Sequence, residues 1–469
     1  MGRVVGVLLG FLAFAAPAFA GGPAMSVGAA EDVAKQQDYD YAKAQMDKAK
    51  LAGLDTIRVT QTWTRNQKAV GPMDTIMLGN VVNAAQFTGV RVILSLFPFG
   101  SSVTPLTDED RANFAEFCVD AAKKFPYVKD FIVGNEPNLN RFWMPQFGPT
   151  GEDVAAPAYV SLLATAYDAL KAERPRSTIY GGGLAPRGVD RPGTGRDTHS
   201  PSTFIPDMGS AYRDSGRQIP IMDAFAFHPY GENSMTPPDF AHPLGSSIGL
   251  ADYAKLVALL GQAFDGTAQR GSTLPIVYDE YGVETTLART KASLYVGTEP
   301  STTKPVDEAT QARFYAQAMA MAFCQPNVLG LLLFHVQDEP ALAAWQSGVY
   351  HLDGTPKSSL TRVRAAAAGV HRGIAARCDG MRLTPKIALQ ITPRIGPGVK
   401  LTLTCSVDCA YTIAVAGRRP LRGTAVGGVR KTIALRWVLS PGPHPVKVTG
   451  VATVNPGPPG SASRTLQVR

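Results

Sequence analysis

The chain has 469 residues, of which 45% are apolar and 18% are charged. This length suits one large domain with a smaller one, and the composition excludes a disordered acidic chain or a coiled coil. The net charge of +8 is concentrated at one end, because the chain from Gly380 onward holds 13 Lys or Arg and one acid, Asp408. The rest of the chain is therefore slightly acidic, and the basic excess needs a local explanation.

The first twenty residues have the pattern of a secretory signal. Arg3 is positively charged, residues 4–16 are apolar, and Ala18-Phe19-Ala20 matches a small-x-small cleavage site. We therefore expect a signal peptide over residues 1–20 and a secreted, extracellular protein. An uncleaved membrane anchor is the alternative, but this run and every later apolar run are shorter than the ~20 residues of a membrane-spanning helix. No membrane span is expected after cleavage.

Residues 21–379 alternate short apolar runs with amphipathic helical patterns. The strand-like runs are 24–27, 56–59, 90–96, 131–133, 178–180, 222–227, 275–278 and 328–334. Helical periodicity marks 39–52, 108–124, 156–171, 251–264, 308–323 and 359–376. This alternation predicts an α/β fold, a (β/α)₈ TIM barrel, whose parallel strands are covered on both faces. A doubly wound sheet is the competing fold, but it usually has a glycine-rich first turn, which is missing here.

The pattern changes after Cys378. Apolar and polar residues alternate in short segments that Gly and Pro clusters separate: 386–391, 400–406, 410–416, 432–438, 446–454 and 463–468. These segments predict a small, basic, immunoglobulin-like antiparallel β-sandwich over residues 380–469.

The chain has five cysteines, and export would permit disulfides. Cys405 and Cys409 lie close together in one strand-like stretch and are expected to pair. Cys324 with Cys378 is a candidate second bond, and Cys118, within a helical pattern, is expected to be a buried free thiol. Connectivity does not follow from sequence alone. Because no histidine lies at ligand spacing near these cysteines, we expect no zinc site, and we predict no metal or cofactor.

Two of the predicted barrel strands end in glutamate. Catalytic groups of a TIM barrel lie at the carboxyl ends of its strands, and Glu136 and Glu280 end the fourth and the seventh strand. These strands are far enough apart in the ring for the two carboxyls to face each other across the mouth. Cleavage of a glycosidic bond needs such a pair, one to protonate the leaving oxygen and one to attack or to activate water. Asp279 alternates with Glu280 and is expected to point outward.

Three motifs on the fourth, sixth and seventh strands carry a family resemblance. They are Gly134-Asn135-Glu136-Pro137, His228-Pro229-Tyr230 and Asp279-Glu280-Tyr281-Gly282. In this order they resemble the clan of retaining (β/α)₈ glycoside hydrolases that includes cellulases, mannanases and β-xylosidases, over residues 24–376. The resemblance implies a retaining β-glycosidase that hydrolyses O-glycosidic bonds by double displacement, with Glu136 as acid/base and Glu280 as nucleophile.

The resemblance also implies roles for four neighbours. Asn135 matches the amide that binds the sugar 2-hydroxyl, and Tyr230 matches the phenol that contacts the nucleophile. His228 lies beside the acid/base. Arg58 matches an arginine on the second strand whose charge keeps Glu280 ionised.

Two departures from the clan leave the closest family and the preferred sugar open. Many members have a histidine pair after the third strand, where this chain has Phe97-Pro98-Phe99. Many end the eighth strand with a tryptophan, where this chain has Phe334-His335, and His335 is a candidate substrate contact. Trp345 either turns in from the following loop or packs there. Trp63 and Trp143 directly follow catalytic strands, and they either stack on sugars or belong to the core.

Two other functions remain as alternatives. The barrel could be a carbohydrate-binding or adhesion protein without turnover, although both carboxylates are present. A serine esterase could use Ser247, which lies in a G-x-S-x-G pattern, but no strand precedes it as the nucleophile elbow requires. The expected partner is a β-linked oligo- or polysaccharide. The basic C-terminal domain suits an anionic cell-surface polymer, and it has no motif for reading nucleic acid.

Overall fold

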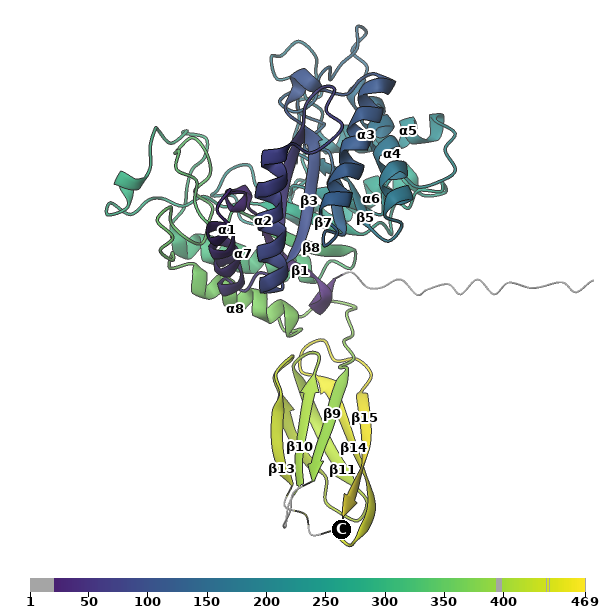
Figure 1. The fold of residues 1–469 in the computed structure, drawn as a ribbon, viewed down its shortest axis with the longest axis vertical. Coiled ribbons are helices and arrows are strands. Elements are labelled where there is room, and N and C mark those ends of the chain that lie inside the picture. The colour runs from purple at the N-terminus through teal and green to yellow at the C-terminus, as the bar shows by residue number, and fades with distance from the viewer. Residues whose placement is uncertain (1–20, 394–398, 436, 438, 469) are drawn as a thin grey trace, which may run out of the picture.

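The computed structural model describes residues 21–393, 399–435, 437 and 439–468 (Figure 1). The predicted signal peptide, residues 1–20, lies outside the described residues. Among the helices that are described, none combines the length and the hydrophobicity that crossing a membrane would require.

Eight parallel strands close into a barrel in chain order, and the last pairs with the first. The strands are β1 (Ser26–Ala30), β2 (Thr56–Trp63), β3 (Arg91–Pro98), β4 (Asp130–Val133), β5 (Thr178–Leu184), β6 (Ala224–Phe227), β7 (Ile276–Tyr281) and β8 (Val328–Phe334). The predicted TIM barrel is confirmed. The strands β2, β5 and β7 continue past their predicted ends, so that Glu280 lies within a strand.

Eight helices surround the strands (Figure 1). They are α1 (Tyr39–Leu51), α2 (Pro72–Thr88), α3 (Asp108–Lys124), α4 (Ala155–Glu173), α5 (Pro201–Asp214), α6 (Tyr253–Phe264), α7 (Glu308–Phe323) and α8 (Leu360–His371). Two of them were not predicted. The apolar residues of α2 do not gather on one face, and α5 follows a long Gly/Pro/Arg-rich loop and contains Pro206.

The interior of the barrel is a packed core. A cluster of buried side chains from its strands fills it: Ile93, Ile132, Tyr180, Ala224, Ala226, Val277 and Leu332. A second, larger cluster fills the layer between strands and helices. Because the barrel has no open channel, polar chemistry is confined to its rims.

The C-terminal domain has two antiparallel sheets. The strands are β9 (Ile387–Pro393), β10 (Val399–Cys405), β11 (Cys409–Val415), β12 (Leu421–Ala425), β13 (Lys431–Leu435), β14 (Gly442–Ala452) and β15 (Gly460–Val468). The orders are β13-β10-β9 and β12-β11-β14-β15, and alternate apolar residues form a separate buried cluster. The predicted sandwich is confirmed, with β12 as an unpredicted short strand. Cys405 and Cys409 are disulfide-bonded as predicted, although they lie not in one strand-like stretch but at the end of β10 and the start of β11.

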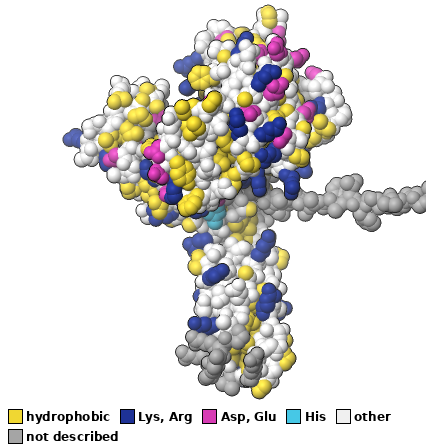
Figure 2. Space-filling view, viewed as in Figure 1, with side chains coloured by type: hydrophobic (Ala, Val, Ile, Leu, Met, Phe, Trp, Pro, Cys, Tyr) yellow, Lys and Arg dark blue, Asp and Glu magenta, His cyan; other side chains and the backbone are white. Residues whose placement is uncertain are grey.

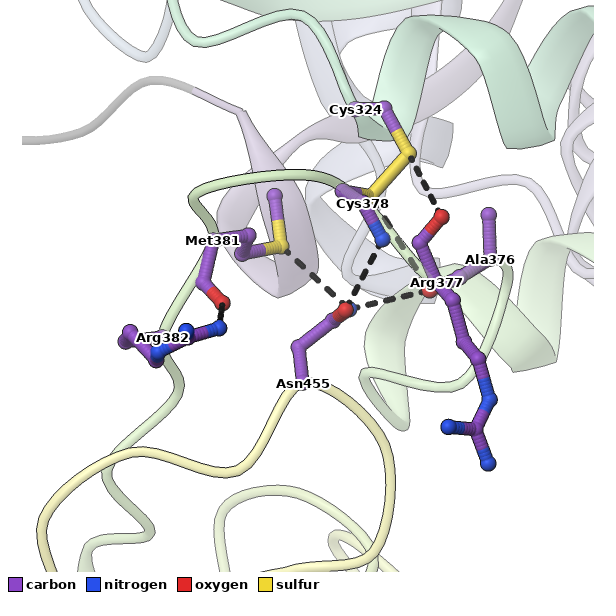
Figure 3. The surroundings of a disulfide bond; sticks show 7 residues. All are labelled: Cys324, Ala376, Arg377, Cys378, Met381, Arg382 and Asn455. Carbon is purple, nitrogen blue, oxygen red and sulfur yellow. Dashed lines mark hydrogen bonds between the residues drawn. A yellow bond between two sulfur atoms is a disulfide. The ribbon is translucent and has the colours of Figure 1, made fainter.

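A disulfide and an asparagine tie the sandwich to the barrel (Figure 3). Cys324, directly after α7, is bonded to Cys378 as predicted, while Cys118 is free and buried. Asn455, in the loop after β14, accepts from Cys378 N at 2.9 Å and donates to Ala376 O at 2.9 Å. The predicted domain boundary, near residue 380, lies beside this attachment.

An ion pair completes the attachment. Arg372, at the end of α8, donates through Nε and Nη2 to the two carboxylate oxygens of Asp408, at 3.0 and 2.6 Å. Leu383 and Met381 of the connecting segment lie near Gly22, just before β1. The sandwich therefore lies at the end of the barrel where the strands begin, below the barrel in Figure 1. It is opposite the strand tips that carry the predicted site.

Candidate active site

The chain leaves β4 through two residues in the left-handed region. Gly134 has φ 100°, and a Cβ added there would lie 2.7 Å from the Tyr159 ring, so both its conformation and its surroundings require glycine. Glu136 has φ 42°, a conformation that costs on the order of 1–3 kcal/mol for a non-glycine residue. Its N–H donates to Gly183 O of β5 at 2.7 Å. This bond ties the backbone of Glu136 to β5, and the side-chain oxygen Oε1 contacts His228 Nδ1 at 3.0 Å.

A buried amide secures the same turn from the other side. Asn138 is fully buried; its Nδ2 donates to Ala185 O at 3.2 Å and to His199 O at 2.9 Å, while its Oδ1 accepts from Ala185 N at 3.0 Å. The loop after β4 is thereby bonded to the end of β5. No sequence motif predicted this role of Asn138.

Asp279 points into the charged site and not toward the helices, so the prediction for this residue is wrong. Its side chain is 0% exposed, and Oδ2 lies 3.3 Å from Arg58 Nε and 3.3 Å from His228 Nε2. The expectation rested on strict alternation along β7. The register between β7 and β8 shifts between Tyr278 and Tyr281, as at a β-bulge, so alternation does not hold there.

Glu280 is held by a guanidinium and a phenol. Arg58 Nη1 donates to Glu280 Oε1 at 2.5 Å, and Tyr230 Oη donates to Glu280 Oε2 at 2.9 Å. Arg58 Nη2 donates to Asn135 Oδ1 at 3.0 Å and to Ser95 Oγ at 3.2 Å. Since its oxygen is taken by Arg58, Asn135 has its amide N–H groups left for another acceptor.

His228 lies between the two glutamates. Its Nδ1 is 3.0 Å from Glu136 Oε1 and 3.6 Å from Glu280 Oε2, and the side chain is fully buried. Burial alone would lower the pKa of His228. The charges of Glu280 and Asp279, with hydrogen bonds to Asp279 and Glu136, instead raise this pKa well above its ordinary value. Both ring nitrogens of His228 therefore face carboxylate oxygens, Nδ1 toward Glu136 and Nε2 toward Asp279, and these surroundings favour the protonated ring.

Tyr230 keeps its proton for a related reason. Burial, followed by the charge of Glu280, raises the pKa of the phenol well above its ordinary value. The protonated phenol donates its O–H to the Glu280 carboxylate and thereby orients it.

The two glutamates face one another at short range. One oxygen of Glu136, one oxygen of Glu280 and one nitrogen of His228 lie within 4.8 Å of one another. The side chains of Glu136 and Glu280 are 16% and 11% exposed, so solvent reaches both. Carboxyls ~5–5.5 Å apart suit covalent glycosyl transfer, whereas inversion needs ~6.5–9.5 Å. An oxygen of each carboxyl therefore lies close enough to the other for both groups to reach one anomeric centre.

The same three groups have the spacing of metal ligands, but their chemistry does not fit a metal site. Both ring nitrogens of His228 already face carboxylates, Nδ1 toward Glu136 at 3.0 Å and Nε2 toward Asp279 at 3.3 Å. Glu280 already accepts from Arg58 and Tyr230, and the guanidinium would repel a metal ion at that carboxylate.

Of the predicted tryptophans, only Trp345 reaches the site. Its ring, half-buried, lies 5.1 Å from the Tyr230 ring and 5.0 Å from the Phe334 ring. Trp63 is 0% exposed and Trp143 1%, and each packs edge-on against a core aromatic ring. The alternative of a sugar platform is therefore wrong for both, because helices cover their faces.

His335 is held by carboxylates. It is buried, with Nδ1 3.7 Å from Glu31 and Nε2 3.6 Å from Glu339. Burial lowers its pKa, but the nearby carboxylates of Glu31 and Glu339 raise the pKa to about 10. These ion pairs replace the substrate contact predicted for His335.

Arg187 is a further cation near the site, and no sequence motif predicted it. It follows β5, and Nη1 donates to Gly231 O at 2.9 Å. Burial lowers its pKa, and the charges of Glu232 and Glu136 oppose that shift. Its guanidinium is thus close enough to Glu136 to interact with it electrostatically.

Ser247 lacks the surroundings of a nucleophile. It lies in a loop without a preceding strand. His242 Nδ1 is 2.7 Å from Asp252 Oδ2, but within the described part of the chain no hydrogen bond joins Ser247 to His242.

Two surface hollows, of about 630 and 480 Å³, lie on the helical exterior along α4, and neither contains a residue of the strand tips.

No protein-family model matches this chain, and no curated protein matches it in sequence. Among solved structures it is similar to GH5_18 from Streptomyces cattleya in complex with GlcNAc, at 16% identity and a TM-score of 0.51, over 77% of this chain and 83% of that one. A point variant of the same GH5_18, in complex with Manb1-4GlcNAc, has 16% identity and a TM-score of 0.50, over 77% and 84%. These two matches show a shared fold.

Bacteroides uniformis β-glucuronidase matches 95% of this chain at 11% identity with a TM-score of 0.48, but only 46% of its own length is covered. The chain therefore spans about half the length of that protein.

Proposed function

We propose that this protein is a retaining β-glycosidase that hydrolyses the O-glycosidic bonds of β-linked oligo- or polysaccharides. The observation that carries the proposal is the pair Glu136 and Glu280, whose oxygens lie within 4.8 Å while Arg58 and Tyr230 hold the second carboxylate. The fold shared with GH5_18, whose structures contain GlcNAc and Manb1-4GlcNAc, supports a glycan substrate.

In the first step, a Glu280 oxygen attacks the anomeric carbon, and the bond from that carbon to the leaving oxygen breaks. Glu136 donates its proton to that oxygen, so the negative charge passes from Glu280 to Glu136. The amide N–H groups of Asn135, whose oxygen accepts from Arg58, are available to donate to the sugar 2-hydroxyl.

In the second step, Glu136 takes a proton from water, and the water oxygen attacks the anomeric carbon. The ester to Glu280 breaks, and Glu280 leaves as a carboxylate beside Arg58 and Tyr230. Two successive displacements leave the anomeric configuration unchanged. His228 contacts the anion at both stages, because Nδ1 is near both glutamates.

A covalent trap tests the assignment. The wild-type chain is screened on aryl β-glucoside, mannoside, xyloside and galactoside, and then incubated with the 2-deoxy-2-fluoro analogue of the best substrate. Mass spectrometry should find the label on the peptide with Glu280, and Glu280→Gln should lose label and turnover. Glu284→Gln, a matched change of a buried glutamate after β7, should keep both the label and the turnover.

A label elsewhere, or an inverted product anomer by NMR, would contradict the proposal. Ligand binding without turnover would favour the carbohydrate-binding alternative.

We also propose that the chain is exported and that its sandwich binds an anionic polymer. The two disulfides suit an oxidising compartment. Exposed Lys and Arg side chains are spread over the sandwich (Figure 2), including Arg422 and Lys447 on the outer face of the four-stranded sheet. Its one acid, Asp408, is paired with Arg372.

Binding of the full chain to an immobilised anionic polysaccharide tests the second proposal. Retention should weaken as salt rises, because the attraction is screened over ~10 Å at 0.1 M. Arg422→Ser with Lys447→Ser should reduce retention, whereas Lys68→Ser with Lys123→Ser on the barrel should not. Equal retention on a neutral matrix would contradict it.

A further inference from the structure

We propose that Asp279 is a positioning residue that holds His228 as a charged bridge between Glu136 and Glu280. The role rests on the proposed glycosidase function, since it concerns the groups that would form and cleave the glycosyl ester. Asp279 touches neither the expected path of the substrate nor the reacting atoms. It acts through two cations that do contact the catalytic carboxyls.

The geometry places one carboxylate oxygen between two cations. Asp279 Oδ2 is 3.3 Å from both Arg58 Nε and His228 Nε2, and the side chain is fully buried. Its other oxygen, Oδ1, is buried without a hydrogen-bond partner among the described residues. Arg58 extends from here to Glu280, and His228 extends to Glu136. Asp279 therefore contacts both of the residues, Arg58 and His228, that in turn contact Glu280 and Glu136.

The charges explain why a third carboxylate is needed. With a proton on Glu136, the cluster of Asp279, Glu280, Glu136, Arg58 and His228 has two anions and two cations. Formation of the glycosyl ester neutralises Glu280 and ionises Glu136, and the balance is unchanged. Asp279 is the only one of these carboxylates whose charge takes no part in the chemistry. It gives His228 a constant anionic partner at Nε2 while the anion at Nδ1 changes from one glutamate to the other.

The other groups around His228 do not provide this partner. The Tyr230 ring lies 6.3 Å from it, edge-on, and donates its proton to Glu280. The buried Tyr159 of α4 donates to Val133 O, and its phenol stays neutral because burial raises its pKa. Arg58 is a cation. Without Asp279, an imidazolium would be left in a buried site with one anion fewer, a costly state that a buried histidine avoids by losing its proton.

NMR titration of the histidines tests the inference without requiring activity. The chain has seven histidines, and His228→Gln identifies the resonance of interest. In the wild type His228 should stay an imidazolium from pH 5 to pH 8. In Asp279→Asn, an isosteric change that removes the charge, it should titrate within that range. Asp130→Asn is the matched control, because Asp130 is also buried in a barrel strand and pairs with an arginine, Arg91, at the opposite end. This control should leave the His228 resonance unchanged.

Kinetics provide the second readout. Asp279→Asn should lower kcat by on the order of 10–100-fold, the equivalent of one lost charge-assisted contact, with a smaller change in KM. Its activity should also fall as pH rises through the lowered pKa of His228. The Asp130→Asn profile should superimpose on the wild type.

The glycosyl-enzyme ester, trapped with a fluoro sugar on wild-type protein, is a further test that needs no variant. His228 should remain an imidazolium although Glu280 is neutral. A neutral His228 in wild type or in the trapped ester would overturn the proposal, as would an unchanged His228 titration in folded Asp279→Asn. If the wild type cleaves no glycoside, the proposed function fails, and the titrations of free protein still decide whether Asp279 holds His228.

Discussion

Arg58 on β2 and Glu280 on β7 form a buried ion pair, with Nη1 2.5 Å from Oε1. The same guanidinium bonds Asn135 through Nη2, so one planar group aligns the proposed nucleophile and the amide expected to contact the sugar. A lysine would keep the charge but not these two directed bonds.

Arg58→Lys should therefore lower kcat by on the order of 10²-fold, because each lost bond to a charged group is worth about 1.5–3 kcal/mol. Steady-state kinetics on the best aryl glycoside would measure this loss. Arg91→Lys, which alters a pair with Asp130 at the other end of the barrel, should not change kcat. An equal loss in both variants would point to general destabilisation.

Glu136→Ala should separate the two steps of the reaction. A 2,4-dinitrophenyl leaving group needs little protonation, so its departure should be nearly normal, whereas alkyl glycosides should lose about 10²–10⁴-fold. The second step then lacks its base, and added azide should restore turnover and give a β-glycosyl azide. Product analysis by NMR would check this, and equal losses on all leaving groups would contradict the role of Glu136.

Trp345→Ala should raise KM by roughly 2–10-fold, the equivalent of ~0.5–1.5 kcal/mol of aromatic stacking. The reason is its partly exposed ring beside Tyr230, 5.1 Å away. Trp143→Phe is the comparison, since Trp143 is packed against Tyr159 in the core. That variant should lower Tm with little effect on KM. If KM responded to Trp143 and not to Trp345, the choice between the two rings would be wrong.

Glu284 should make the fold less stable as pH rises. Its pKa is raised from an ordinary 4.5 to about 7, mainly by burial. The hydrogen bond from Gln346 N lowers this pKa, whereas the charges of Glu299 and Asp338 raise it. The folded protein then binds more protons than the unfolded chain between pH 4.5 and 7, so stability falls through that window. Glu284→Gln should flatten the fall and raise Tm at pH 8 by on the order of 2–4 °C. Scanning calorimetry from pH 4 to 8 would measure it, and parallel wild-type and variant curves would exclude the effect.

Asp408→Asn should loosen the sandwich without affecting the strand tips. It removes the bidentate pair with Arg372, at the end of the barrel away from Glu280. We expect faster proteolytic cleavage in residues 376–386, most clearly after reduction of Cys324–Cys378, with an unchanged kcat. A fall in kcat would show that the sandwich communicates with the site.

Local patterns in the sequence determined much of this protein. Alternating apolar runs and helices predicted the barrel, because each pattern reports the period of one element. The polar residues at or near the predicted strand ends indicated which side chains meet at the carboxyl ends, including Glu136, Glu280, Arg58 and Tyr230. The change to period-two alternation predicted the sandwich, and the spacing of Cys405 and Cys409 favoured their pairing, whereas the Cys324–Cys378 bond was one candidate that the structure contains.

Tertiary structure decided what depends on neighbouring elements. The direction of Asp279 follows from a register shift between β7 and β8, which strand alternation cannot reveal. Trp63 and Trp143 are buried because helices cover them. The short gap between Glu136 and Glu280, and the place of His228 within it, come from the closure of the barrel. Periodicity is a property of one segment, whereas distance, burial and charge pairing at a site are properties of several segments packed together.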